Sequence, residues 1–152
     1  MTRPIDFYYS PTPNGWKVSI MLEEGGLSYN TILINLKKGE QFDKDFLRIN
    51  PNKKIPAITD YEGNDNPINI FESGAILLYL AEKTGKFIPN SKYEKRLLIQ
   101  WLFWQVGNLG PMGGQHSHFW NYAPTCEKKS YAAKRYAEEY KKCLEVLEYQ
   151  LY

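Results

Sequence analysis

Three short stretches of the sequence stand out at the ends of predicted strands and helices, and two of them carry polar side chains. The first is a loop with Thr12 and Asn14, the second is the pair Ile55-Pro56, and the third is the pair Glu72-Ser73. Glu72-Ser73 directly precedes apolar residues at helical spacing, so this pair lies at a helix N-terminus. The free backbone N–H groups of such an end point outward and favour an anion. The third stretch therefore predicts an anion-binding helix end.

A hairpin and a helix position the second and third stretches. Two short apolar runs flank the polar loop at residues 62–67, which is typical of a β-hairpin. Pro56 opens the first run, where proline costs least in a strand. After the second run, apolar residues at helical spacing continue to Gly85, which ends the helix as a C-cap.

The residues before this hairpin predict alternating strands and helices. Ile5 to Tyr9 is rich in aromatic residues and predicts a strand, which the stiff loop at residues 10–15 breaks. Helical spacing then ends at Gly25-Gly26, and residues 29–36 alternate as a second strand. An amphipathic turn at residues 46–49 follows. The order β-α-β, short helix, β-β-α predicts a thioredoxin-like α/β domain.

The second half of the chain predicts helices alone. Residues 1–87 are expected to form the thioredoxin-like domain, and residues 91–152 an all-α C-terminal domain. Ser91 and Glu94 have capping-box spacing, so a helix starts there. The glycine-rich stretch at residues 107–114 is expected to interrupt it, and the last helix is expected from about Lys128 to the end.

Composition narrows the function and the compartment. The chain has 152 residues and a net charge of +2, from 19 basic and 17 acidic residues, which argues against nucleic-acid binding. We find no apolar leader and no apolar run long enough for a membrane span. The only cysteines, Cys126 and Cys143, form no CxxC pair. The expected location is the reducing cytoplasm.

Seven motifs are spread over both halves of the chain. They are Ser-Pro-Thr-Pro-Asn-Gly-Trp-Lys at residues 10–17, Gly-Glu-Gln-Phe at 39–42, Asn-Pro-Asn-Lys-Lys-Ile-Pro-Ala at 50–57, Phe-Glu-Ser-Gly-Ala-Ile-Leu-Leu-Tyr-Leu at 71–80, Gln-Trp-Leu-Phe-Trp-Gln-Val-Gly at 100–107, Gly-Pro-Met at 110–112 and Lys-Arg-Tyr at 134–136. With these motifs nearly the whole chain resembles the glutathione transferases, and in particular the nu class. That class comprises bacterial glutathione-dependent disulfide-bond oxidoreductases and is related to a transferase-like domain of a fungal nitrogen regulator.

The resemblance implies an enzyme that uses the thiolate of bound glutathione as its reacting sulfur. It implies a disulfide-bond reductase or transferase that binds glutathione or glutathione disulfide, acts on a small-molecule or peptide disulfide, and requires no metal. It also implies a homodimer. The physiological disulfide or electrophile stays open.

The resemblance also implies roles along the tripeptide. Thr12 and Asn14 donate toward the glutathione sulfur, and Gln41 contacts the glycyl end. Ile55 offers its backbone N–H and C=O to the cysteinyl backbone, ahead of a cis bond to Pro56.

The same resemblance implies how the charged ends are held. Glu72 takes the γ-glutamyl ammonium, and Ser73 with the helix N-terminus takes its carboxylate. Arg135 is a candidate for a carboxylate of a second glutathione, from its own or a partner subunit. Tyr8 is a rival sulfur donor, because other branches use a tyrosine here, but we expect it to pack.

Each of these residues also has a purely structural interpretation. Thr12 could stiffen its loop, Asn14 could be an N-cap, and Gln41 and Arg135 could be solvated surface residues. The Trp-rich stretch at residues 100–105 is typical of a core or a dimer face, and less so of an electrophile pocket.

Histidine and cysteine offer little alternative chemistry. His116 and His118 lack a neighbouring cysteine or carboxylate cluster, so a metal site is disfavoured. Cys126 and Cys143 are interpreted as inert, partly buried thiols.

Two alternatives to an active enzyme remain. Transferases of this kind carry further helices, so the C-terminal domain is expected to contain the first helices only. The chain is then either a fragment or a natural short form, and whether that form is active stays open. It could be a glutathione-binding regulatory or interaction protein with little turnover, or a truncated remnant.

Overall fold

The computed structural model describes residues 3–62 and 66–152, which form two compact units that meet in the sequence at Pro89 and Asn90. Part of the predicted hairpin turn, Gly63-Asn64-Asp65, lies outside the described residues.

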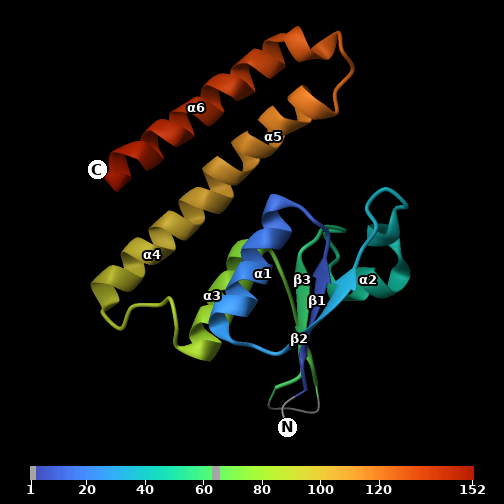
Figure 1. Cartoon of the computed structure of the whole chain (residues 1–152), viewed down its shortest axis with the longest axis vertical. Helices are drawn as coiled ribbons and strands as arrows, with labels where there is room; N and C mark the ends of the chain where they lie inside the picture. The colour runs from blue at the N-terminus through green and yellow to red at the C-terminus, as the bar shows by residue number, and fades with distance from the viewer. Residues whose placement is uncertain (1–2, 63–65) are drawn as a thin grey trace. The chain divides into compact units, whose positions relative to one another are not determined.

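The first unit is built on a four-stranded mixed sheet with the strand order β2-β1-β3-β4. The strands are β1 (Ile5–Tyr9), β2 (Tyr29–Leu33), β3 (Ala57–Asp60) and β4 (Ile68–Phe71). β1 pairs with β2 in parallel and with β3 in antiparallel, and β3 pairs with β4 in antiparallel. Three α-helices pack on this sheet, α1 (Pro13–Gly25), α2 (Lys44–Ile49) and α3 (Ser73–Thr84) (Figure 1). The predicted thioredoxin-like fold is confirmed.

The two faces of the sheet carry separate apolar clusters, because successive strand residues point to opposite faces. On one face Phe7 and Ile58 pack against residues of α1 and α3, including the fully buried Leu22 and Ile76. On the other face Ala57 packs with Ile34 of the chain after β2 and Phe46 of α2. The sheet is therefore covered on both sides by helices, with α1 and α3 together on one face (Figure 1).

The second strand is shorter than the sequence predicts. It ends at Leu33, although the Ile34 N–H still donates to the Tyr9 carbonyl at 2.8 Å. The Asn35 Oδ1 then accepts the N–H groups of both Lys37 and Lys38 at 3.1 Å. This side-chain turn competes with strand pairing and diverts the chain into a short 3-10 helix, Glu40–Phe42.

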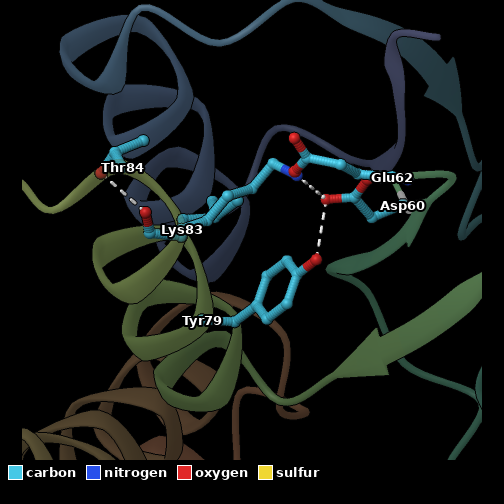
Figure 2. Close-up of polar contacts among 6 residues, drawn as sticks. Asp60, Glu62, Tyr79, Lys83 and Thr84 are labelled. Carbon is cyan, nitrogen blue, oxygen red and sulfur yellow. Dashed lines mark hydrogen bonds and ion pairs between the residues drawn. The ribbon is translucent and has the colours of Figure 1, made fainter. Parts of the chain in front are cut away.

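A buried polar cluster joins the end of β3 to α3 (Figure 2). The Asp60 side chain is 1% exposed, and its Oδ2 accepts from the Tyr79 hydroxyl at 2.8 Å and pairs with the Lys83 Nζ at 2.9 Å. Lys83 also pairs with the more exposed Glu62. Burial, together with the hydrogen bond to Asp60, raises the pKa of Tyr79 to about 12.

The second unit is a helical hairpin. Its helices are α4 (Lys92–Trp104), α5 (Gly110–Asn121) and α6 (Tyr131–Leu151), with a short 3-10 helix at Glu127–Lys129. α6 returns along α5 (Figure 1), and the Phe119 and Tyr136 rings stack with their centroids 5.8 Å apart. The Ser91 Oγ accepts from the Glu94 N–H at 3.5 Å, so the predicted helix start is confirmed.

The prediction that glycines interrupt the first long helix was wrong. Residues Gln105–Leu109 form a π-helical turn that leads into α5 without a break. In this wider turn the Gly110 N–H donates to the Gln105 carbonyl. A Cβ on Gly110 would lie 3.1 Å from that oxygen, so glycine permits the close approach. Pro111, which lacks an N–H, follows in the first turn of α5.

The last helix begins three residues later than predicted. Ser130 is its N-cap and accepts from the Ala133 N–H at 3.3 Å. Within the described ranges, no helix combines the length and the apolar character that crossing a membrane would require.

Candidate functional site

Strand register brings the three predicted stretches to one end of the sheet. Tyr8 lies opposite Ala57, and Ala57 lies opposite Phe71. The loop after β1, the residues before β3 and the residues after β4 are therefore neighbours. Each of the three stretches identified from the sequence lies just before or just after a strand at this end of the sheet.

Thr12 is the N-cap of α1. Its backbone is extended, and its Oγ1 accepts from the Gly15 N–H at 3.2 Å. The cap uses only the oxygen, so the hydroxyl hydrogen of this half-buried side chain is available to a ligand. Asn14 is not the cap; it lies exposed in the first turn of the helix.

Gly15 allows this turn to lie against the end of β1. A Cβ at this position would be 2.5 Å from the Ser10 carbonyl oxygen and 2.9 Å from the Tyr9 ring. No real Cβ atom tolerates such contacts, so the helix start would move if a side chain were present. The sequence contains this glycine within a recognised motif, but the motif does not reveal the steric reason.

The peptide bond between Ile55 and Pro56 is cis, as predicted. Ile55 is half-buried and precedes β3 directly. Among the described residues, the N–H and the C=O of Ile55 have no hydrogen-bond partner. Both groups are thus available for pairing with an extended peptide ligand.

Glu72 has an unusual backbone conformation at the start of α3. It occupies the N-cap position with φ 69° and ψ 116°, and its carbonyl accepts from the Ile76 N–H at 2.9 Å. A positive φ is uncommon outside glycine, and such strain concentrates at functional sites. The Glu72 side chain is exposed, and its Oε1 accepts from the Asn52 Nδ2 at 3.2 Å.

Ser73 follows as the first residue of α3 and is buried. The first turn itself contains no acidic residue, so its backbone N–H groups present positive potential beside the Glu72 carboxylate. The helix end thus combines a carboxylate at Glu72 with an anion-binding first turn, as a zwitterionic ligand group requires.

Lys17 adds a cation that the sequence reasoning missed. It lies on α1 beyond the Thr12 cap and is half-buried. Burial lowers the pKa of Lys17, and the charge of the neighbouring Glu72 opposes this shift. Only the packing of α1 beside α3 brings these two residues together, so sequence spacing gives no signal for the pair.

Gln41 lies in the short 3-10 helix after β2. Its Nε2 donates to the Leu36 carbonyl at 3.4 Å, a long contact. Its Oε1 is buried and has no partner among the described residues. In this conformation the amide offers its N–H groups rather than its oxygen, and no hydrogen bond joins it to Ile55 or Glu72 within the described chain.

Arg135 and Tyr8 lie outside this group of contacts. Arg135 is exposed on α6, with its Nη1 4.0 Å from the Glu139 Oε1, and it belongs to the second unit. Its site role stays a prediction. Tyr8 packs its ring against Phe46 with a centroid separation of 5.7 Å.

The histidines and cysteines show no chemical grouping. In the described part of the chain, no three His, Cys, Asp or Glu side chains could together hold a metal ion. His116 stacks on Tyr140 at 5.5 Å. Both cysteines are free thiols; Cys143 is buried, but Cys126 is exposed, so the prediction that both are partly buried was wrong for Cys126.

A family model and several known proteins match this chain. The model described as the N-terminal domain of glutathione S-transferase matches residues 4–82. The chain is 52% identical to the disulfide-bond oxidoreductase YfcG of Escherichia coli strain K12, over 97% of the chain and 68% of that relative. It is 46% identical to the disulfide-bond oxidoreductase YghU of the same organism, over 98% of the chain and 53% of that relative.

A solved structure also matches this chain in three dimensions. A glutathione transferase from Burkholderia graminis, with two glutathione molecules bound per subunit, aligns with a TM-score of 0.93 and 46% identity. The alignment covers 97% of this chain and 62% of that chain. This chain thus spans between half and just over two thirds of the length of these relatives.

Proposed function

We propose that this chain, which belongs to the glutathione transferase family, binds glutathione at this end of the sheet and uses the glutathione sulfur to reduce disulfides. One observation carries the proposal. The Thr12 hydroxyl, the backbone groups of Ile55 that have no partner in the described part of the chain, and the helix end at Glu72-Ser73 all lie at the same end of the sheet. The relatives named as disulfide-bond oxidoreductases favour an enzyme over a binding protein with little turnover.

The proposed pose runs along the tripeptide. Glu72 pairs with the γ-glutamyl ammonium, while Ser73 and the first turn of α3 hold its carboxylate. Ile55 pairs with the cysteinyl backbone through its N–H and C=O, which no described residue engages. Gln41 donates its amide to the glycyl carboxylate, since a carboxylate needs a donor and the Nε2 makes only the long contact to the Leu36 carbonyl at 3.4 Å.

Thr12 and Asn14 activate the sulfur. A thiolate is the reactive form of glutathione, and donors near the sulfur favour it over the thiol. The Thr12 hydroxyl hydrogen is not used by the helix cap, and Asn14 is exposed in the adjacent turn. The N-terminus of α1 favours negative charge in the same place.

The chemistry is two successive thiol–disulfide exchanges. The glutathione thiolate attacks one sulfur of the substrate disulfide, forming a mixed disulfide and releasing the other sulfur as a thiolate that takes up a proton. A second glutathione thiolate attacks the glutathionyl sulfur of the mixed disulfide. Glutathione disulfide forms, and the second substrate thiol is released. Two glutathiones are oxidised and one disulfide is reduced.

Two glutathiones per subunit in the Burkholderia graminis relative support this scheme, because both partners of the exchange can be bound together. Arg135 is our candidate for a carboxylate of the second glutathione. We further propose that the chain pairs as a homodimer, takes small-molecule or peptide disulfides and works in the cytoplasm.

Calorimetry with glutathione tests the binding site. Glu72→Ala should weaken binding by about 1.5–3 kcal/mol, the scale of a charge-assisted hydrogen bond. Asp45→Ala, which removes a carboxylate that is 94% exposed on α2, is the matched control and should change nothing. Equal affinity in the native chain and in Glu72→Ala would remove Glu72 from the site.

A further inference from the structure

We propose that Asn50 is a positioning residue that aims the Ile55 N–H and fixes the Glu72 carboxylate, so that one buried side chain aligns both halves of the glutathione site. The proposal rests on the proposed function above. It assigns a role to a residue that touches neither the ligand nor the reacting sulfur.

Asn50 directly follows α2, and the loop to β3 folds around its side chain. It is 2% exposed, and its backbone N–H donates to the Phe46 carbonyl at 2.9 Å, which ends α2. Its Nδ2 donates to the Lys54 carbonyl at 2.6 Å, and its Oδ1 accepts from the Asn52 N–H at 2.9 Å. One side of the amide donates and the other accepts, so its orientation is fixed.

The bond to Lys54 determines where the Ile55 N–H points. The Lys54 C=O and the Ile55 N–H belong to the same trans peptide unit, and in such a unit the two groups point in opposite directions. Because the carbonyl is directed at the buried Asn50, the N–H faces away from it. Asn50 thereby exposes the donor that the cysteinyl carbonyl of glutathione needs.

The bond to Asn52 reaches the other half of the site. With its backbone N–H held by Asn50, Asn52 extends its own Nδ2 to the Glu72 Oε1 at 3.2 Å. Glu72 is exposed, so this contact limits the positions that its carboxylate samples. The carboxylate is then already placed for the γ-glutamyl ammonium, which lowers the ordering cost of binding.

The loop folds around Asn50 by adopting a conformation that most residues avoid. Lys53 has φ 58°, and its N–H donates to the Asn50 carbonyl at 3.1 Å. A left-handed lysine is strained, and such strain persists only where surrounding contacts impose it. Backbone and side chain of Asn50 together make those contacts.

The first test compares two buried polar residues of the same unit. Asn50→Ala should weaken calorimetric glutathione binding at least about ten-fold, since both alignments are lost. Thr59→Val removes a buried hydroxyl that donates to Asn69 at 2.7 Å, away from the loop. It should lower the melting temperature yet leave the dissociation constant unchanged.

Nuclear magnetic resonance adds a signal that general destabilisation does not move. Glutathione should shift the Ile55 amide proton downfield in the native chain and in Thr59→Val, because that N–H gains an acceptor. In Asn50→Ala the shift should be lost. If Asn50→Ala does not fold, the same measurements are made on Asn50→Ser. The shorter serine side chain cannot bond to both Lys54 and Asn52.

Asn52→Ala tests the second branch with an exposed residue. It should weaken glutathione binding about three-fold alone, and add no further loss in a Glu72→Gln background. If the native chain binds glutathione and the Asn50 variant binds it as tightly as Thr59→Val does, the positioning role is overturned. The proposed function would still stand. Failure of the native chain to bind glutathione would overturn the proposed function and this inference with it.

Discussion

The Thr12 side chain has two separate tasks that fall on different atoms. Its oxygen caps α1 by accepting from Gly15, and its hydrogen remains for the glutathione sulfur. Loss of the side chain therefore removes a cap, at a cost of about 1 kcal/mol, as well as the proposed donor. Thr12→Ser keeps both functions and separates loss of the methyl group from loss of the hydroxyl.

We predict that Thr12→Ala and Asn14→Ala each reduce glutathione-dependent disulfide reduction about ten-fold or more, as expected for the loss of a donor to a developing anion. Thr12→Ser should retain most turnover. Tyr8→Phe should matter little, because the ring packs against Phe46. Steady-state turnover, with folding matched by thermal melts, provides the comparison.

The opposite result would change the mechanism. If Tyr8→Phe abolishes turnover and Thr12→Ala does not, the sulfur donor is a tyrosine. Cys126→Ser and Cys143→Ser should leave turnover intact, since the reacting sulfur belongs to glutathione. Loss of turnover in either would mean that the chain carries its own redox sulfur.

Gly15 is the position where the smallest substitution should do the most harm. Gly15→Ala forces a Cβ to 2.5 Å from the Ser10 carbonyl oxygen, and we predict a loss of about 1–3 kcal/mol in the free energy of unfolding. Gly114→Ala, in open space on α5, is the control and should stabilise by up to about 1 kcal/mol. Urea unfolding measures both; equal stability in Gly15→Ala would mean that the helix start moves freely.

At the scale of single elements, the sequence predicted those helix ends that depend on neighbouring residues. The Ser91 cap and the Gly85 helix end depend on residues within one turn, and both were predicted. The π-helical turn before Pro111 and the side-chain turn at Asn35 were not, because each competes with a regular element that the apolar spacing favours.

The site divides in the same way. Motif residues such as Glu72 and Ile55 were predicted because they lie in recognisable stretches. The proximity of Lys17 to Glu72 and the hydrogen bond from Asn52 to Glu72 arise from packing between segments distant in sequence. The Asn50 contacts to Asn52 and Lys54 are local, but they form a side-chain turn that apolar spacing does not encode. No spacing rule within one segment reports such contacts.

The buried polar cluster at Asp60 should contribute strongly to the packing of α3 against β3. Lys83→Met leaves the Asp60 carboxylate buried without its cation, and we predict a loss of about 3–5 kcal/mol in the free energy of unfolding. Glu62→Gln removes the second, more exposed carboxylate that pairs with Lys83. This change should cost less than about 1 kcal/mol in the free energy of unfolding. Urea titrations of both variants test this order, and equal losses would contradict it.

Alkaline pH should loosen the first unit through two tyrosines. Burial raises the pKa of Tyr79 to about 12, and the hydrogen bond to Asp6 does the same for Tyr61. A raised folded-state pKa means that this stabilisation is complete below the ordinary value of 10 and is lost between pH 10 and 12.

Tyr79→Phe and Tyr61→Phe should therefore be less stable than the native chain below pH 10, with the gap closing as pH rises toward 12. Unfolding free energies measured across this range provide the test. A gap that widens with pH would reverse the sign of the argument.

At the scale of the whole molecule, apolar surface remains on the helical unit. Phe103 is 67% exposed, beside Trp101 and Trp104, whose rings meet edge to face at 5.2 Å. Exposed aromatic residues are typical of protein interfaces. This surface supports the proposed homodimer.

We predict a dimer at micromolar concentration in sedimentation velocity, and a shift toward monomer in Phe103→Glu, because a charge at an apolar contact carries a desolvation cost. Tyr149→Glu, on a side chain that is 88% exposed on α6, is the control. A native chain that sediments only as monomer would count against the dimer.

The strand order β2-β1-β3-β4 also has a consequence for biosynthesis. The first strand made, β1, is an interior strand of the sheet, and its antiparallel partner β3 leaves the ribosome only after α1, β2 and α2. Until then one edge of β1 has no hydrogen-bonded strand beside it. Its apolar side chains also lack their packing partners, Ile58 of β3 and the residues of α3. The first unit is thus expected to close late, as a whole, rather than strand by strand during translation. A nascent chain stalled before Asp60 should accordingly be a substrate for chaperones rather than a partly finished domain.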